Sequence, residues 1–195
     1  MTKAELRVIL RELQKVIQTK VPGDVVELGC YEGTSALFEA RMLKEMAPQK
    51  ELYLYDSFEG LPAKGSEDAS ATGVLFKEGE LRASRSRLTK NFVHAGLVVP
   101  FIYKAWFSDL VPANLPDQIC FAFLDGDFYD SIMDSLKLVW PKMAAGAVVI
   151  VDDYQNAALP GASRAVDEWL VQQTDGHLLH PATLQAEASL AIIKT

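Results

Sequence analysis

Cysteines and membrane signals are scarce in this sequence. Of 195 residues only Cys30 and Cys120 are cysteines, and they do not form a Cys-x-x-Cys pair, so no disulfide framework is indicated. No apolar run reaches the roughly 20 residues that a membrane-spanning helix needs. Charges throughout the N-terminal residues differ from a signal peptide. We therefore expect a cytoplasmic protein without a membrane partner.

Basic residues are also in short supply. The chain has 19 Lys and Arg against 26 Asp and Glu, a net charge of -7, whereas proteins that bind nucleic acid need a basic surplus. We expect no nucleic acid partner, and interpret the local cluster Arg82, Arg85, Arg87 and Lys90 as a solvated helix face. The 49% hydrophobic and 23% charged residues are typical of one globular domain, residues 1–195.

Three sequence motifs are missing. The glycine-containing stretch reads Gly29-x-x-x-Gly33, so the Gly-x-Gly-x-x-Gly fingerprint of dinucleotide-binding folds is not met. No P-loop lysine follows these glycines, and there is no Gly-x-Ser-x-Gly elbow. These absences remove the main support for NTPase and hydrolase functions.

What is present is an alternation of short apolar runs and helical patterns. The expected strands are residues 25–28, 52–55, 98–103, 119–124, 147–151, 177–181 and 189–194, and the expected helices are 4–19, 34–46, 80–92, 131–140 and 162–173. This order predicts an α/β fold, a Rossmann-like doubly wound sheet with helices on both faces. The last two strands are too close in sequence for a crossover helix, so they should pair antiparallel.

Several local features refine this prediction. Residues 1–20 contain an amphipathic N-terminal helix, and the polar segment 59–79 is a candidate lid over a site. Pro100 places its strand at a sheet edge. Thr34 and Ser35 are N-cap residue types, and Gly96 is a C-terminal cap candidate.

Ligands of such sheets bind beyond the carboxyl ends of the strands. The first strand delivers the turn 29–33, where glycines permit a close backbone approach and the next helix offers free N–H groups. Asp56 ends the second strand, where a carboxylate can accept hydrogen bonds from both ribose hydroxyls. Each feature alone also fits a ligand-free turn; together they favour a nucleotide-like ligand.

Three further carboxylates follow later strands: Asp125, Asp152 and Asp153. Like charges gathered at one edge repel one another unless a cation is bound or a group protonates. Oxygen ligands suit Mg²⁺, and no neighbouring His or Cys indicates zinc. The alternative is that Asp152 and Asp153 only cap a turn.

Five stretches together resemble the macrocin O-methyltransferase family of class I S-adenosylmethionine-dependent enzymes. They are residues 27–33 (ELGCYEG), 55–62 (YDSFEGLP), 105–107 (AWF), 124–131 (LDGDFYDS) and 152–154 (DDY). The resemblance covers about residues 21–170. It implies a seven-stranded, mostly parallel sheet with an antiparallel last strand. The chain departs from the family at Cys30-Tyr31-Glu32 and at Ala105, where the family carries a bulkier turn and a glycine.

The resemblance also implies roles for individual residues. Asp125, Asp152 and Asp153 would bind Mg²⁺, and Asp125 would also be the catalytic base. The implied cofactor-binding residues are Glu27, Gly29, Tyr31, Gly33, Thr34, Ser35, Asp56, Ser57, Ala105, Trp106 and Asp125.

We therefore predict a Mg²⁺-dependent O-methyltransferase that uses S-adenosylmethionine and acts on a hydroxyl of a small molecule, with a natural-product sugar as one option. Two alternatives remain open: a nucleotide-binding oxidoreductase, and a non-catalytic S-adenosylmethionine-binding module. The acceptor is not named by the sequence. A homodimer through the N-terminal helix is a further hypothesis.

Overall fold

The computed structural model describes the chain except for residues 72–74, 174–179 and 186–188. Its strands are β1 (Asp24–Leu28), β2 (Leu52–Asp56), β3 (Phe101–Lys104), β4 (Ile119–Leu124), β5 (Met143–Val151), β6 (His180–Gln185) and β7 (Leu190–Lys194). The α-helices are α1 (Lys3–Gln18), α2 (Thr34–Met46), α3 (Arg85–His94), α4 (Tyr129–Val139) and α5 (Pro160–Gln172). Short 3-10 helices are η1 (Ser66–Asp68), η2 (Phe107–Asp109), η3 (Pro112–Asn114) and η4 (Trp140–Lys142).

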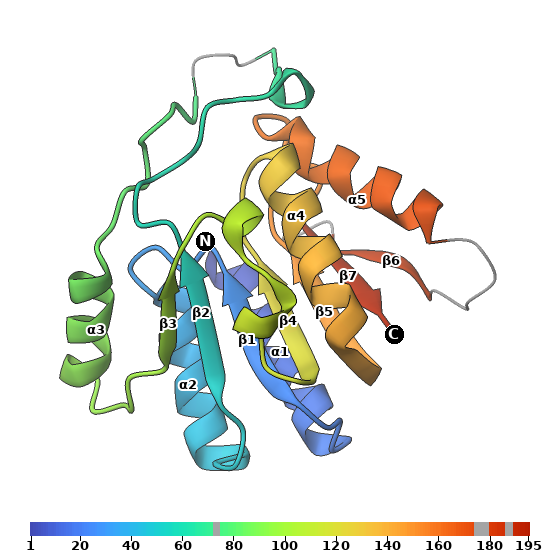
Figure 1. Ribbon diagram of the computed structural model, residues 1–195. Coiled ribbons are helices and arrows are strands. Elements are labelled where there is room, and N and C mark those ends of the chain that lie inside the picture. The colour runs from blue at the N-terminus through green and yellow to red at the C-terminus, as the bar shows by residue number, and fades with distance from the viewer. Residues whose placement is uncertain (72–74, 174–179, 186–188) are drawn as a thin grey trace.

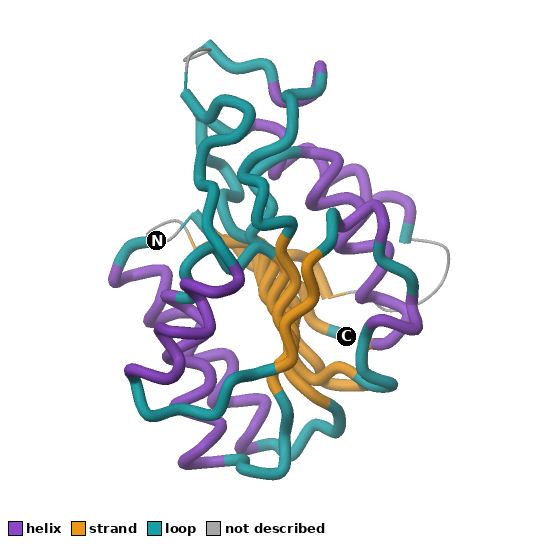
Figure 2. Tube along the Cα trace, turned by 60° about the vertical axis from the view of Figure 1, so that its left-hand side comes forward, coloured by secondary structure: helices purple, strands orange, loops and turns teal. Residues whose placement is uncertain are grey.

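One sheet organises the molecule, in the order β3-β2-β1-β4-β5-β7-β6. The first five strands of this order pair in parallel, while β7 runs antiparallel to both β5 and β6. Figure 2 shows the sheet between two layers of helices. The predicted α/β class, with a mostly parallel sheet and an antiparallel last strand, is confirmed.

Strand β4 explains why the core forms two layers. All six of its residues are buried. Phe121 and Phe123 pack into the core beneath α1, α2 and α3, whereas Ala122 and Leu124 pack into the core beneath α4 and α5. An uninterrupted apolar run is what a parallel strand covered on both faces requires.

Helix α1 begins with a capping box, in which the Thr2 hydroxyl accepts the Glu5 N–H and the Glu5 carboxylate accepts the Thr2 N–H. Its apolar residues Ile9, Leu13 and Val16 are buried against the chain's own core. The hypothesised dimer would therefore have to use the polar face of this helix. In the described part of the chain, no helix is both long enough and apolar enough to cross a bilayer.

Some predicted boundaries are wrong. Helix α3 starts at Arg85, because the Ser84 side chain caps it by accepting the Arg87 N–H, so residues 80–84 are not helical. Arg82 lies before the helix and pairs with Glu59 at 2.9 Å; the basic cluster is therefore not a single helix face. Gly96, with φ of 65°, follows the helix end as predicted.

Other differences lie at strand ends. Pro100 precedes β3 instead of lying within it, while β3 does occupy a sheet edge. Strand β5 starts four residues earlier than predicted, at Met143, and β6 starts at His180. Residues 177–179 of the predicted strand lie outside the described residues.

Candidate functional site

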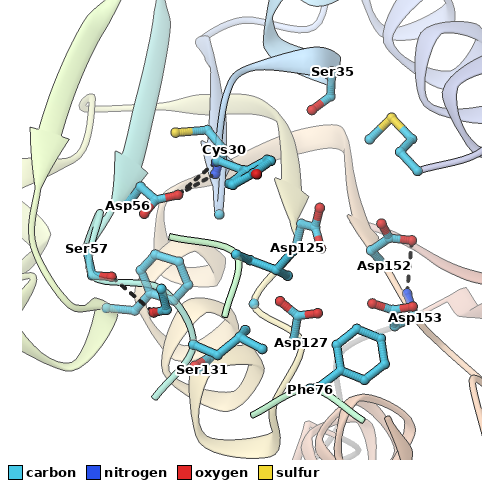
Figure 3. Close-up of a pocket in the computed structure, with 18 of the residues that line it drawn as sticks. Cys30, Ser35, Asp56, Ser57, Phe76, Asp125, Asp127, Ser131, Asp152 and Asp153 are labelled. Carbon is cyan, nitrogen blue, oxygen red and sulfur yellow. Dashed lines mark hydrogen bonds between the residues drawn. The ribbon is translucent and has the colours of Figure 1, made fainter. Parts of the chain in front are cut away.

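A cavity of about 390 Å³ lies at the carboxyl ends of β1, β2, β4 and β5. The backbone bonds of the sheet continue just past the strands: Gly29 N–H donates to Tyr55, Asp125 N–H to Leu28, and Asp152 N–H to Leu124. The first residues after the strands are therefore held at the same level. Figure 3 shows their side chains converging on the cavity.

Glycine is required at the first turn for steric reasons. Gly29 has φ of 92°, and a Cβ at this position would lie 1.9 Å from the backbone oxygen of Asp125. Gly33 has φ of 87° and is the N-cap of α2. The predicted N-cap role of Thr34 and Ser35 is therefore wrong. Gly33, whose backbone lies in the left-handed region, is the N-cap instead.

Asp56 stabilises this turn. Its Oδ2 accepts the backbone N–H groups of Cys30 and Tyr31 at 3.0 and 2.9 Å, and its Oδ1 accepts that of Phe58 at 2.6 Å. A carboxylate has about four acceptor sites, so about one remains for a ligand. The prediction gave Asp56 two ribose hydrogen bonds; in the structure it also holds together the loops after β1 and β2.

Glu27 lies below the cavity and does not line it. The side chain is fully buried, and its Oε1 accepts a hydrogen bond from the Ser35 hydroxyl at 2.7 Å. Ser35 does line the cavity. Any contribution of Glu27 to ligand binding therefore passes through Ser35.

The carboxylates after β4 and β5 form a cluster. Asp125, Asp127 and Asp153 each offer an oxygen within 4.8 Å of the others. Asp152 is not a member of this group, although it was one of the predicted Mg²⁺ ligands. Its Oδ1 instead accepts the N–H of Asp153 at 2.9 Å. Asp127 replaces it through a local turn in which its own φ is 60°.

Burial and mutual repulsion raise the pKa values of these carboxyl groups. The pKa of Asp125 is raised well above its usual value by burial, and then by the charges of Asp152, Asp127 and Asp153. Burial, together with the charge of Asp153, raises the pKa of Asp127 to about 7 and that of Asp152 to about 8. Three crowded oxygen ligands with little positive compensation fit a hard divalent cation.

The rest of the cavity wall is apolar and comes from loops. Leu61, Pro62, Phe76 and Leu81 line it from the segment between β2 and α3, and Trp106 lines it after β3. Phe76 also packs against a small buried cluster formed by Leu61, Phe128 and Leu159. This combination of an acidic floor and apolar walls suits a ligand that has both polar and apolar parts.

Asp68 anchors the loop that contributes most of that wall. It is buried, its Oδ1 accepts the Tyr129 N–H at the start of α4 at 2.8 Å, and its Oδ2 accepts the Gly65 N–H at 3.0 Å. A Cβ on Gly161, at the start of α5, would lie 1.8 Å from its Oδ1. The loop is thus attached to the N-termini of two helices.

The structure brings most of the predicted site residues together. The predicted residues that line the cavity are Gly29, Tyr31, Thr34, Ser35, Asp56, Ser57, Ala105, Trp106, Asp125, Asp152 and Asp153. Glu27 and Gly33 do not line it. The lining residues outside the predicted cofactor and metal sets include Asp127, Ser131, the four apolar loop residues and, from the N-terminus, Met1, Thr2 and Glu5.

Asp127 could have been found from the sequence, because it stands two residues after Asp125 behind the same strand. No local signal identified the N-terminal residues, since their position depends on how α1 packs against the sheet.

Most of the chain is similar to known O-methyltransferases. The profile of the Macrocin-O-methyltransferase (TylF) family matches residues 1–177. Demethyldecarbamoylnovobiocin O-methyltransferase of Streptomyces niveus is 30% identical over 164 residues, which cover 80% of this chain and 62% of that protein. A tetracenomycin rhamnosyl 4'-O-methyltransferase of Streptomyces olivaceus is 31% identical over 149 residues, 73% of this chain and 57% of that protein. The chain thus spans about three fifths of the length of these relatives.

Solved structures of methyltransferases also resemble this chain. The O-methyltransferase NovP superposes with a TM-score of 0.82 at 27% identity, over 98% of this chain and 79% of that chain. The calicheamicin methyltransferase CalS11 superposes with a TM-score of 0.75 at 19% identity, over 97% of this chain and 77% of that chain; this second likeness concerns the fold alone.

Proposed function

Because the chain belongs to the macrocin O-methyltransferase family, we propose that it transfers the methyl group of S-adenosylmethionine to a hydroxyl of a small natural product, with Mg²⁺ as a second cofactor. The observation that carries the proposal is the single cavity that joins a glycine turn, an aspartate after β2 and a carboxylate cluster. Such a cavity offers separate places for a nucleoside, a cation and an acceptor hydroxyl.

The cofactor would occupy the side of the cavity formed by the loops after β1, β2 and β3. Asp56 has an acceptor site left for a ribose hydroxyl, and Trp106, which is 37% exposed, offers a ring for stacking against adenine. Thr34 and Ser35, at the start of α2, line the part of the cavity nearest the glycine turn. Gly29 keeps the chain close to the ligand.

The carboxylate cluster would hold Mg²⁺. We assign Asp125, Asp127 and Asp153 to it, since their oxygens converge. When bound, the cation lowers the pKa of an acceptor hydroxyl. Asp125 remains our assignment for the group that accepts the hydroxyl proton, and Asp127, which lines the same cavity, is the second candidate.

The acceptor would lie against the apolar loop residues. The names of the relatives give demethyldecarbamoylnovobiocin and a dimethoxyrhamnosyl tetracenomycin as their acceptors. Leu61, Phe76 and Leu81 offer apolar surface above the acidic floor. In this proposal residues 59–79 act as a lid that excludes water during transfer, within one domain of residues 1–195.

Binding and turnover test the proposal. We expect S-adenosylhomocysteine to bind in calorimetry and NAD not to bind. With labelled S-adenosylmethionine and Mg²⁺, a panel of glycosylated and phenolic acceptors should yield labelled ether products. Asp127→Asn should abolish turnover. The control is Asp109→Asn, a substitution at an exposed aspartate that does not line the cavity. Binding without turnover on any acceptor would leave a non-catalytic binding module, and NAD binding would favour an oxidoreductase.

A further inference from the structure

A second pair of acidic side chains lies beneath the cavity. Glu27 on β1 and Glu39 on α2 are both fully buried. No described residue outside the pair donates a hydrogen bond to the Oε2 of Glu27 or to either carboxylate oxygen of Glu39. The contacts described for this part of the chain include no basic side chain on either carboxyl group. Neither residue has a place in the proposed chemistry.

The geometry links this pair to the cavity. Ser35 and Glu39 are four residues apart and so lie on the same side of α2, which faces Glu27. The Ser35 hydroxyl donates to Glu27 at 2.7 Å and lines the cavity, as Figure 3 shows at the start of α2. A chain of polar groups thus runs from buried Glu39 through Glu27 to a surface that a ligand would contact.

Electrostatics require a proton within this pair. Two ionised carboxylates, buried together without a cation, would repel each other and lack hydration. Burial raises the pKa of Glu27 to about 8, although hydrogen bonds from Ser35 and Glu39 oppose this rise. Burial raises the pKa of Glu39 well above its usual value, and the charge of Glu27 and the hydrogen bond to it raise that pKa further. The remaining titratable neighbours, Asp56, Asp125 and Cys30, are acidic as well. They add repulsion and supply no compensating charge.

We propose that Glu39 is a positioning residue for the cofactor: the proton it shares with Glu27 holds Glu27 against Ser35, so that the Ser35 hydroxyl donates downward and presents its lone pairs to the cavity. A ligand group that donates hydrogen bonds is thereby selected at this point. The ammonium group of S-adenosylmethionine is such a donor, so this inference rests on the proposed function.

The protonation of the pair can be measured without any ligand. In the unfolded chain both carboxyl groups release their protons near pH 4.5, whereas in the native protein burial raises the pKa of Glu27 to about 8 and holds that of Glu39 well above its usual value. Native protein therefore binds more protons over this interval, and the free energy of unfolding falls as pH rises. In Glu39→Gln the side-chain amide donates to Glu27. This variant should reduce the slope of the unfolding free energy against pH by the equivalent of about one proton. Glu45→Gln, exposed on the same helix, should leave it unchanged.

An unchanged slope in Glu39→Gln would overturn the proposal. If that variant does not fold, Glu27→Gln tests the same proton, and the infrared absorption of a protonated carboxyl group at pH 7 tests it in the wild type. Absence of that absorption would be equally decisive against the pair.

Ligand binding tests the positioning role. In calorimetry with S-adenosylhomocysteine, Glu39→Gln should keep the wild-type affinity within about twofold, because its amide still donates to Glu27. Glu39→Leu, which leaves Glu27 unpartnered, should bind about tenfold more weakly at every pH, and adding Ser35→Ala should then cost little more. An unchanged affinity in Glu39→Leu would overturn the role. If the wild type does not bind this probe, the proposed function fails, and the stability profile still decides whether the pair holds its proton.

Discussion

Asp56 at the end of β2 and the aspartates after β4 and β5 face the same cavity, but they differ in the groups that surround their carboxylates. The carboxylate of Asp56 accepts three backbone N–H groups. Asp125 and Asp127 accept no hydrogen bond among the described side chains and backbone groups that contact them, and are surrounded by other carboxyl groups. The protein itself therefore supplies hydrogen-bond donors to Asp56. For Asp125 and Asp127, donors or positive charge have to come from a ligand, a cation or protons.

This difference separates structural from chemical roles. Charge-assisted hydrogen bonds to amides stabilise the folded chain, so Asp56 contributes to the loop architecture before any ligand arrives. A group of carboxyl groups without such partners destabilises the folded chain unless protons or a cation bind. The first kind of aspartate should matter for stability, and the second for activity.

The largest effect should come from removing divalent metal. We expect a chelator to reduce methyl transfer at least about a hundredfold, since the loss of a bound cation removes several kcal/mol of charge stabilisation, and added Mg²⁺ should restore activity. Because protons compete for the same oxygens, the affinity for Mg²⁺ should rise as pH increases through about 7, the pKa of Asp127 without metal. Full activity in excess chelator would contradict the proposed metal and break the comparison.

The next largest effect should come from Asp56→Ala. Two N–H groups of the glycine turn and one of the next loop lose their acceptor, and each such charge-assisted bond is worth about 1.5–3 kcal/mol at most. We expect the unfolding free energy measured in urea to fall by about 2–3 kcal/mol and S-adenosylmethionine to bind at least about tenfold more weakly. Asp109→Ala, on an exposed 3-10 helix, is the control. An unchanged affinity would mean that the ribose lies elsewhere.

The smallest effect should come from Asp152→Asn. Asparagine keeps an acceptor for the Asp153 N–H but removes one charge from the crowded region. The folded-state pKa of Asp152 is about 8 against a reference of 3.8, so ionisation destabilises the wild type increasingly as pH rises between these values. We expect the variant to be more stable than wild type at pH 8 by about 1 kcal/mol without metal, and nearly equal at pH 4.

The same variant sharpens the metal assignment. Asp152 lies outside the converging group, so Asp152→Asn should weaken Mg²⁺ binding less than Asp127→Asn does, as measured by the metal-induced rise in melting temperature. Equal losses in the two variants would place Asp152 among the ligands, as the sequence had indicated.

Local patterns were sufficient for much of the fold. The continuous apolar run of β4 has only one stable environment, between two helical layers, so its limits were predicted without error. The positions of Asp56 and Asp125 followed because parallel strands end at one edge. The start of α3 was harder, because Ser84 and the residues before it differ little in helix propensity and the cap decides.

Long-range contacts account for what was missed. Asp68 looked like one polar residue of a loop, and its role depends on Tyr129 and Gly161, which lie 61 and 93 positions away in the sequence. Asp127 was not among the predicted Mg²⁺ ligands, because nothing in the sequence showed that a left-handed turn would direct it toward Asp153. Both cases concern side-chain direction, which periodicity does not encode.

The contact between Asp68 and Gly161 has a consequence for how this protein can diversify. A loop attached at one buried residue can gain, lose or exchange residues on either side while remaining in place over the cavity. The apolar wall of the cavity is thus separable from the anchor that positions it. Substitutions at Leu61, Phe76 and Leu81 can alter the wall while the anchor stays in place, whereas a larger residue at Gly161 requires a change at Asp68 as well.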